Sequence, residues 1–526
     1  MSAKKLSIVV VAHQPYIRHT EGENSPYAQQ NDILFGALSQ TYIPMINMLH
    51  KFEEEGVNAK FSLVLSPVLC AMLDDKLIQE QYVSWLDRCI CLGQREVERL
   101  KDNKDLLELA QSQLEKAQNN KADFVEKYRC NLLKEFAYFY QKEMIELLAT
   151  CGSYAFLPHY ADMEEILNAQ VETGVFSHKH YFSTAPEGFW LPYMGYSQGI
   201  ERILRSYGLN YTILDAKSVL FSQNMPEKGI YVPVRCENSL VIFGRDALTP
   251  KDIDDSETGF SANKIYKNQH RDIGYELSAE ELGCFIKADT ARVNSLYRYW
   301  SKGDESNSIY DSKKAREQAL EDAKTFLSEK NAKLAEASKQ IDEDVCLVCC
   351  INAESLGQNW AEGMDWFENV LRLNKDSEFA SCSQMLKNQF KLERITPYPC
   401  AASGNGYGED LLDSSNSWML RYTRKMCERM CDLVGRFPTD TGLKARLLNL
   451  GAKELMIAQS AEWSKMLHNS SSPEYAKYRF TASVTAFTTV FDSLGSNVVS
   501  TEWLTKLEKE HNLFPWMNFR IFAKKI

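Results

Sequence analysis

Long hydrophobic runs are missing from this 526-residue sequence, and none of its apolar stretches approaches the roughly 18 residues that a membrane span requires. Positive charge is also scarce, because 60 basic residues stand against 71 acidic ones and the formal net charge is −11. This balance opposes non-specific binding to phosphate backbones and to anionic lipid. We therefore expect neither nucleic acid nor membrane among the partners.

Targeting and low-complexity features are equally scarce. The first apolar run, residues 6–12, is too short for the core of a secretory signal and has the length of a buried strand. There is no internal repeat and no biased tract, and 44% of the residues are hydrophobic. These features predict a folded, soluble, cytoplasmic protein that is too long for one compact core. The sequence leaves the oligomeric state open.

The pattern of a zinc site is missing too, although the chain has 14 cysteines. Cys346, Cys349 and Cys350 lie in one apolar run, where cysteine serves as a small hydrophobic residue, and no second Cys/His pair at zinc-finger spacing follows. We expect mostly reduced thiols, no metal and no cofactor. The Gly-rich stretch at residues 401–410 lacks the Lys-Ser/Thr of a phosphate-binding loop and predicts a rim loop.

The chain does contain a series of short apolar runs separated by amphipathic segments. Parallel strands that are covered by helices read as solid hydrophobic stretches. We therefore predict an α/β fold with a parallel sheet, and we favour a barrel over an open sheet. The predicted strands are residues 6–12, 61–65, 153–157, 188–191, 211–214, 240–243 and 345–351.

Charged helical segments interrupt this alternation. Residues 95–140 carry apolar side chains at near-heptad spacing, which predicts a helical hairpin broken near Asn119 and Asn120. We favour an insertion packed on its own barrel over a coiled-coil surface for a partner. Residues 312–341 predict another long helix. Helices dominate from residue 376, so we predict a barrel domain at 1–375 and a C-terminal helical domain at 376–526.

Short motifs follow the predicted strands in a defined order. They are His13-Gln-Pro-Tyr16, Ala155-Phe-Leu-Pro158, Pro186-Glu-Gly-Phe-Trp-Leu-Pro192, Phe243-Gly-Arg-Asp246, His270-Arg-Asp-Ile-Gly-Tyr275, Ala353-Glu354, Asn416-Ser-Trp418, Ala458-Gln-Ser460 and Asn512-Leu-Phe-Pro515. In this order and near this spacing, the motifs resemble glycoside hydrolase family 57, and within it the 1,4-α-glucan branching enzymes. The resemblance covers nearly the full chain.

This resemblance implies an incomplete (β/α)7 barrel with an inserted helical region and a C-terminal helical domain that closes the cleft. It places the active site at the carboxyl ends of the strands. The family is retaining, so its mechanism resembles the scheme in which one carboxylate attacks the anomeric carbon and another, about 5 Å away, protonates the leaving oxygen. The implied ligand is an α-glucan polysaccharide of the glycogen type.

Both catalytic carboxylates that the resemblance implies are missing. Tyr193 stands at the position of the nucleophilic glutamate, and Asn352 stands at that of the acid/base aspartate. An amide has no titratable proton to give, and a phenol with a pKa of about 10 is a poor nucleophile without a neighbouring base. The family's own chemistry therefore lacks its two reacting groups.

Polar neighbours have changed together with this pair. By the same resemblance, Tyr154 replaces a histidine, Gln358 and Asn359 replace a His-Trp pair, and Glu462 replaces an aspartate. Loss of one carboxylate could be accidental. Coordinated loss of the pair and its neighbours indicates relaxation or redirection of the site.

The aromatic lining of the family's glucan cleft is partly kept. Aromatic faces stack on sugar rings independently of any catalytic step. We assign substrate binding to Trp190, Trp360, Trp418, Trp463, His13 and Glu354. Structural roles are the alternatives: Trp190 could close the barrel, and His13 could be a hydrogen-bonded core residue. Glu354 and Glu362 are candidates for displaced catalytic acids, but a buried network is the more ordinary interpretation.

Three functional hypotheses follow. The first is an α-glucan-binding relative of the branching enzymes that is catalytically inactive or impaired. The second is an active branching enzyme or glycoside hydrolase with a rearranged pair, in which Tyr193 attacks and a carboxylate activates it. That carboxylate could be Glu354, Glu362, Glu462 or Asp410. The third is a structural or protein-binding scaffold whose cleft is closed by bulky side chains. Whether the chain is an enzyme thus stays open.

Overall fold

The computed structural model describes residues 2–21, 25–286, 293–303, 308–387 and 391–525. Its sheet runs in the order β6-β7-β5-β4-β3-β2-β1-β8, with β9 paired to β1. The strands are β1 (Lys4–Ala12), β2 (Phe61–Leu65), β3 (Ile145–Thr150), β4 (Gly188–Trp190), β5 (Tyr211–Leu214), β6 (Val234–Arg235), β7 (Val241–Gly244), β8 (Val345–Asn352) and β9 (Glu378–Phe379). From β8 to β7, seven strands pair in parallel, and among the strands of the described residues only β6 and β7 pair antiparallel.

The sheet curls until its two ends meet. Arg245, directly after β7, forms an isolated parallel bridge with Val348 of β8. The backbone N–H of Asp246 also donates a hydrogen bond of 2.7 Å to the Val348 carbonyl. Because this contact is a single bridge and not a full ladder, the barrel is incomplete. The predicted (β/α)7 barrel is confirmed.

One predicted strand is wrong. Residues 153–157 form a loop, and the third strand is β3, Ile145–Thr150, a few residues earlier. The physical reason is the backbone of Tyr154, which has a φ of 57° and therefore lies in the left-handed region that an extended strand cannot contain. The loop instead turns the chain over the end of the barrel.

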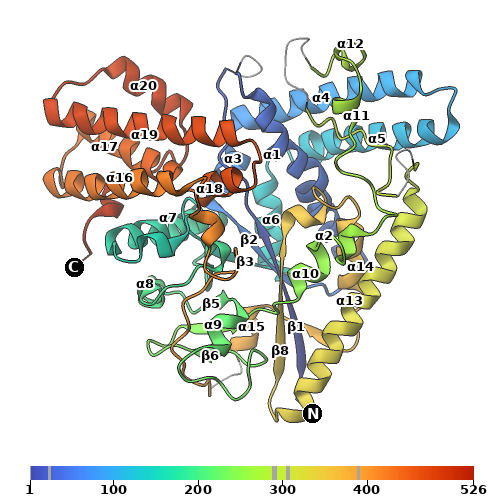
Figure 1. Cartoon of the computed structure of the whole chain (residues 1–526), viewed down its shortest axis with the longest axis horizontal. Coiled ribbons are helices and arrows are strands. Elements are labelled where there is room, and N and C mark those ends of the chain that lie inside the picture. Colours follow the sequence, from blue (N-terminus) through green and yellow to red (C-terminus); the bar gives the residue numbers. More distant parts are fainter. Residues whose placement is uncertain (1, 22–24, 287–292, 304–307, 388–390, 526) are drawn as a thin grey trace.

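Helices surround the sheet (Figure 1). They are α1 (Asn31–Ala37), α2 (Ile43–Glu55), α3 (Pro67–Asp74), α4 (Lys76–Arg99), α5 (Lys104–Ala122), α6 (Leu132–Gln141), α7 (Glu164–Phe182), α8 (Ile200–Ser206), α9 (Ala216–Leu220), α10 (Thr249–Asp254), α11 (Ile273–Glu276), α12 (Ala279–Leu282), α13 (Ser312–Gln340), α14 (Gly363–Leu373), α15 (Cys382–Leu386), α16 (Ser417–Arg436), α17 (Gly442–Ala458), α18 (Ala461–His468), α19 (Pro473–Ser496) and α20 (Thr501–Glu510). No helix in the described part of the chain combines the length and apolarity of a bilayer span.

The hairpin predicted over residues 95–140 is not the one that forms, because α5 runs unbroken through Asn119 and Asn120 and the hairpin consists of α4 and α5, residues 76–122. Helices α4 and α5 pack side by side above the barrel, and the chain turns at residues 100–103, not near Asn119 and Asn120. Asn103 caps α5, because its side chain accepts a hydrogen bond from the N–H of Leu106. Asn120 lies inside α5 and donates to the carbonyl of Ser39 instead, at 3.1 Å.

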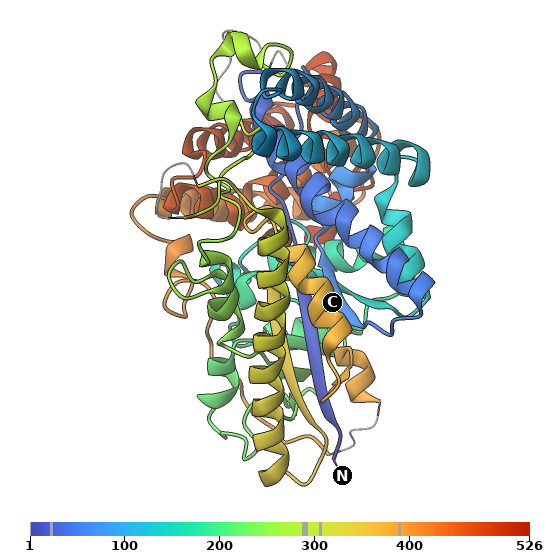
Figure 2. The ribbon, with the colours of Figure 1, turned by 90° about the vertical axis from the view of Figure 1, so that its right-hand side faces the viewer.

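The other predicted long helix agrees with the structure, and the C-terminal helices form a group of their own. Helix α13 lies along β1 and β8 (Figure 2). Helices α16 to α20 stack beside the upper end of the barrel in Figure 1, with α17 packed on α19. Strand β9 still pairs with β1 at residues 378–379, and the domain boundary at residue 375 stays a prediction.

A buried ion-pair network fixes α13 to the closing edge of the sheet. The ammonium of Lys330 is fully buried and donates to Asp246 at 2.7 Å and to Asp252 at 2.5 Å, and Lys333 also contacts Asp246. Burial opposes ionisation of Asp246, but the hydrogen bonds from the two lysines outweigh it and lower the pKa of Asp246 to about 2.

We expect Lys330→Met to destabilise the fold by about 3 kcal/mol, because it removes the buried cation shared by Asp246, which keeps only Lys333, and the partly exposed Asp252. The matched control is Lys324→Met on the same helix, which removes only the exposed pair with Glu321 and should cost less than about 1 kcal/mol. Denaturant unfolding of both variants measures the difference. Equal losses of stability would contradict the structural role of Lys330.

Candidate functional site

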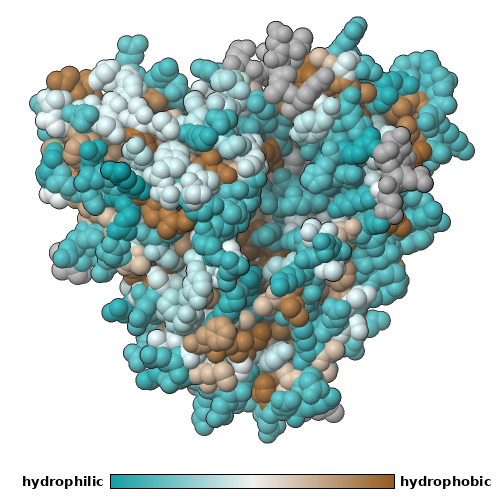
Figure 3. Space-filling model, in the orientation of Figure 1, coloured by the Kyte–Doolittle hydropathy of each residue, from teal (hydrophilic) through white to brown (hydrophobic). Residues whose placement is uncertain are grey.

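The carboxyl ends of the parallel strands bring together residues that are far apart in the sequence. His13 follows β1, Ser66 follows β2, Tyr193 follows β4, and Asn352 is the last residue of β8. Asn352 is exposed and aligns with Val11 of the neighbouring strand β1, two residues before His13. Figure 3 shows the surface hollowed between the C-terminal helices and the α4–α5 hairpin. This arrangement is that of a cleft at the mouth of a barrel.

His13 is held from three sides. Its Nδ1 is 2.8 Å from the hydroxyl of Ser66, its ring stacks on Tyr154 with centroids 3.9 Å apart, and its Nε2 is 3.9 Å from Glu462. Burial lowers the pKa of His13 to about 3, so the imidazole is neutral at physiological pH. The contact with Glu462 is therefore not an ion pair.

Tyr193 is turned toward the C-terminal helices. Its backbone has a φ of 53°, its hydroxyl donates a hydrogen bond to Glu462 on α18, and its carbonyl accepts one of 2.7 Å from Ala402 in the Gly-rich loop. Burial, then the charges of Glu462 and the neighbouring Tyr154, raise the pKa of Tyr193 well above its usual value. The phenol is thus protonated and engaged with a carboxylate.

Glu354 is a carboxylate of the cleft with an unusual environment. Its side chain is exposed to solvent, yet desolvation by the surrounding protein, followed by the charges of Glu462 and Asp254, raises its pKa to about 7. A group that is both exposed and partly desolvated lies on a concave surface. Asp254 itself accepts a hydrogen bond of 2.9 Å from Ser355.

Of the four tryptophans assigned to substrate binding, three are buried and one is exposed. Trp360 is 1% exposed and packs on Trp366, and Trp463 is 0% exposed and donates to the carbonyl of Ile457 at 2.7 Å. Trp190 is also buried, whereas Trp418 on α16 is 36% exposed. Only Trp418 thus offers an open ring in this conformation, and burial favours a packing role for the other three. Their assignment to substrate binding stays a prediction.

Sequence reasoning predicted several residues that the structure brings to the strand ends, but it missed the pairing of Tyr193 with Glu462. Tyr193 and Glu462 are 269 positions apart, and no local pattern signals their hydrogen bond. Glu362, considered as a displaced acid, is 1% exposed and accepts from the backbone N–H of Lys267, so it belongs to a buried network. Within the described residues there is no group of three or more His, Cys, Asp or Glu side chains placed to hold a metal ion.

The fold and the site define a β/α-barrel protein with its cleft at the strand ends, partly covered by C-terminal helices. The family model "Glycosyl hydrolase family 57" matches residues 7–398, and the model "1,4-alpha-glucan branching enzyme, C-terminal" matches residues 422–522. The chain therefore belongs to glycosyl hydrolase family 57.

Known relatives agree with this assignment. A 1,4-alpha-glucan branching enzyme of Thermococcus kodakarensis is 22% identical over 508 residues, which cover 90% of this chain and 71% of that one. The crystal structure of the alpha-amylase AmyC from Thermotoga maritima superposes with a TM-score of 0.91 at 26% identity over 100% of both chains. A branching enzyme from Thermococcus kodakaraensis, solved with glucose, gives 0.88 at 21% identity over 99% and 97% of the two chains, which shows the fold.

The raised pKa of Glu354 predicts a pH-dependent effect of Glu354→Gln. The unfolded chain ionises this carboxyl at its usual pKa of 4.5 and the folded chain at about 7, so its contribution to stability is lost as pH rises through that window. The substitution should raise the melting temperature at about pH 8 and change it little at about pH 4, where the carboxyl is mostly protonated in both states. Thermal unfolding at both pH values measures this, with exposed Glu317→Gln as the control. A shift of equal size at both pH values would contradict it.

Proposed function

We propose that this protein binds α-glucan of the glycogen type in the cytoplasm and does not carry out retaining glycosyl transfer. The observation that carries the proposal is the hydrogen bond from Tyr193 to Glu462. By family resemblance, Tyr193 occupies the position of the nucleophile, and its hydroxyl is already committed to a carboxylate. The names of the relatives, branching enzymes and an amylase, support α-glucan as the ligand class.

The electrostatics of the cleft support loss of the family's chemistry. A tyrosine nucleophile must become a phenolate, but Glu462, Tyr154 and Glu354 all raise the pKa of Tyr193. The ammonium of Lys465 is 5.9 Å from the centroid of the Tyr193 ring, but it is paired with Asp410. At the other reacting position, Asn352 has no acidic proton for a leaving oxygen.

The same cleft retains groups that suit a neutral polysaccharide. Glu354, with a pKa of about 7, presents both a donor and an acceptor near neutrality, and exposed Asn352 presents an amide. By family resemblance, Trp418 belongs to the same cleft, and its ring is 36% exposed. Aromatic rings and a few polar groups are the usual lining of a sugar-binding surface.

A second candidate function rests on the same hydrogen bond. A nucleophile in contact with a base is the arrangement of an activated nucleophile, and Glu354 has the raised pKa of a general acid. In that case Glu462 would take the proton of Tyr193, the phenolate would attack the anomeric carbon, and Glu354 would protonate the leaving oxygen. Tyrosine nucleophiles of this kind act in sialidases.

For binding, we expect the protein to be retained on a glycogen gel. Trp418→Ala should weaken the free energy of binding by about 1 to 3 kcal/mol, which is typical of an aromatic hot spot. Trp418→Phe keeps an aromatic face and is the matched control. Trp463→Ala is a poor test by comparison, because that ring is fully buried and its loss perturbs the fold. Migration identical to that in a gel without glycogen would instead favour a protein-binding scaffold.

For chemistry, we expect no branching, transfer or hydrolysis of amylose above background, because general acid catalysis alone typically contributes about 10² to 10⁴-fold and both family carboxylates are gone. Tyr193→Glu alone should stay inactive, since Asn352 gives no proton, whereas Tyr193→Glu with Asn352→Asp has the two required groups. Iodine staining and a reducing-end assay measure all three proteins. Turnover by the unmodified protein that Tyr193→Phe and Glu354→Gln each abolish would establish the second candidate instead.

A further inference from the structure

A cavity of about 710 Å³ lies away from the residues of the cleft. It is bounded by α2, α4, α5 and α14, together with residues 267–269 and 295–298, and none of His13, Tyr193, Asn352, Glu354 and Glu462 lines it. In Figure 1 these helices lie on the opposite side of the strand ends from the C-terminal helices. The volume is within the range of roughly 300 to 1,000 Å³ that is usual for small-molecule sites.

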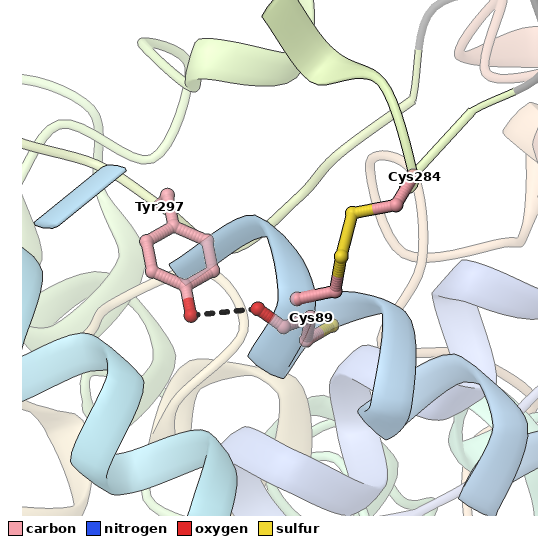
Figure 4. Close-up of a disulfide and its surroundings, with 4 residues drawn as sticks. Cys89, Cys284 and Tyr297 are labelled. Carbon is pink, nitrogen blue, oxygen red and sulfur yellow. Dashed lines mark hydrogen bonds between the residues drawn. A yellow bond between two sulfur atoms is a disulfide. The ribbon is translucent and has the colours of Figure 1, made fainter. Parts of the chain in front are cut away.

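The walls of this cavity are tied together. The hydroxyl of Tyr297 donates to the carbonyl of Cys89 at 2.8 Å, close to the disulfide between Cys284 and Cys91 of α4 (Figure 4). The backbone N–H of Arg298 donates to Gln113 of α5, also at 2.8 Å. These contacts join Cys284, Tyr297 and Arg298 to the two helices of the hairpin, so the cavity is preformed.

Positive charge predominates in the lining. The basic residues are Lys51, Lys116, Lys127, Lys267 and Arg298, and the acidic residues are Asp123, Asp365 and Glu368. Two of the acids are occupied: Glu368 accepts hydrogen bonds from Lys51 and Arg372, and Asp123 accepts one from Asn47. Burial raises the pKa of the third, Asp365, which weakens its negative charge.

Of these cations, Lys51 is paired with Glu368 and Arg298 with Asp272, whereas Lys116 and Lys267 form no ion pair with the described residues. Within the described residues the ammonium of Lys267 has no hydrogen bond or ion pair, and its nearest recorded contact is the ring of Tyr310, 4.6 Å away. Burial, then repulsion from Lys116, lowers the pKa of Lys267 to about 7. Arg298 and Arg316 add to the repulsion, and Glu362 opposes it. An anion placed between Lys116 and Lys267 would relieve this repulsion.

Neutral polar groups fill much of the remaining lining. They are Ser39, Gln40, Asn47, Gln113, Asn119, Asn120, Gln269 and Ser295. The side-chain oxygen of Gln269 is buried and has no hydrogen-bond partner. A buried acceptor without a partner is costly unless a ligand supplies the donor. Amides arranged in this way suit the hydroxyl groups of a sugar.

We propose that this cavity binds a small phosphorylated sugar, with the phosphate between Lys116 and Lys267 and the hydroxyl groups on the surrounding amides. Hydrogen bonds from lysine to phosphate are charge-assisted and stronger than those between neutral groups. The amides distinguish a sugar phosphate from inorganic phosphate. The site is independent of glucan binding in the cleft, because the two share none of the residues named above.

Calorimetric titration of the whole protein with glucose 6-phosphate, inorganic phosphate and glucose tests the proposal. Glucose 6-phosphate should bind most tightly, inorganic phosphate more weakly, and glucose not measurably. Lys267→Met and Lys116→Met should each weaken binding of glucose 6-phosphate by about tenfold or more. Lys116 is exposed, so its replacement leaves the fold intact. Lys104→Met is the control, because Lys104 is exposed on the same helix and lies outside the cavity.

Proton uptake distinguishes binding at Lys267 from non-specific attraction of the anion to other positive charges of the protein. Binding of an anion raises the pKa of Lys267, so the wild-type protein should take up protons at about pH 7 and lose affinity as the pH rises toward about 9, where glucose 6-phosphate keeps its charge. Lys267→Met should show neither effect, and all variants should keep their retention on glycogen. Binding of glucose as tight as that of its phosphate, or unchanged affinity in both lysine variants, would overturn the proposal.

Discussion

The closure of the sheet on itself is the constraint on which the rest of the structure depends. Seven parallel strands could form an open sheet, in which the ends of β4 and β8 would lie far apart. The bridge from Arg245 to Val348 brings the last strands together, and the bonds of Lys330 and Lys333 to Asp246 fix the long helix α13 behind that contact. Because the strand ends then form a ring, His13, Tyr193 and Asn352 face a common space.

In that ring, the C-terminal helices complete the site instead of merely covering it. Glu462 comes from α18, yet it contacts Tyr193 after β4 and approaches His13 after β1. The stack of His13 on Tyr154, and the edge contact of Tyr154 with Tyr193 at 5.8 Å, fill the centre with rings. A space occupied by hydrogen-bonded aromatic side chains favours recognition at its rim over attack on a sugar at its base.

The sequence was sufficient for the barrel, because solid apolar runs are local signals and six of them coincide with strands. The assignment of Tyr193 and Asn352 to the family's catalytic positions rests on motif spacing and stays a prediction. Strand β3 was missed because its run contains Glu146, a charged residue that is buried in the structure, where Ser62 of β2 donates a hydrogen bond of 2.8 Å to it. The pairing of Tyr193 with Glu462 and the burial of Trp360 and Trp463 depend on tertiary contacts, which no local pattern contains.

Burial together with neighbouring charges of the same sign produces opposite electrostatic environments around Glu354 and around Lys267. In the cleft, burial and neighbouring carboxylates raise the pKa of Glu354 to about 7, and in the cavity beside the hairpin, burial and neighbouring cations lower the pKa of Lys267 to about 7. Each group is therefore close to half-neutral near physiological pH, and each is sensitive to an incoming ligand. A neutral sugar suits the first environment, because a protonated carboxyl can donate to a hydroxyl without bringing a net charge. An anion suits the second, because it restores the charge that the surrounding cations disfavour.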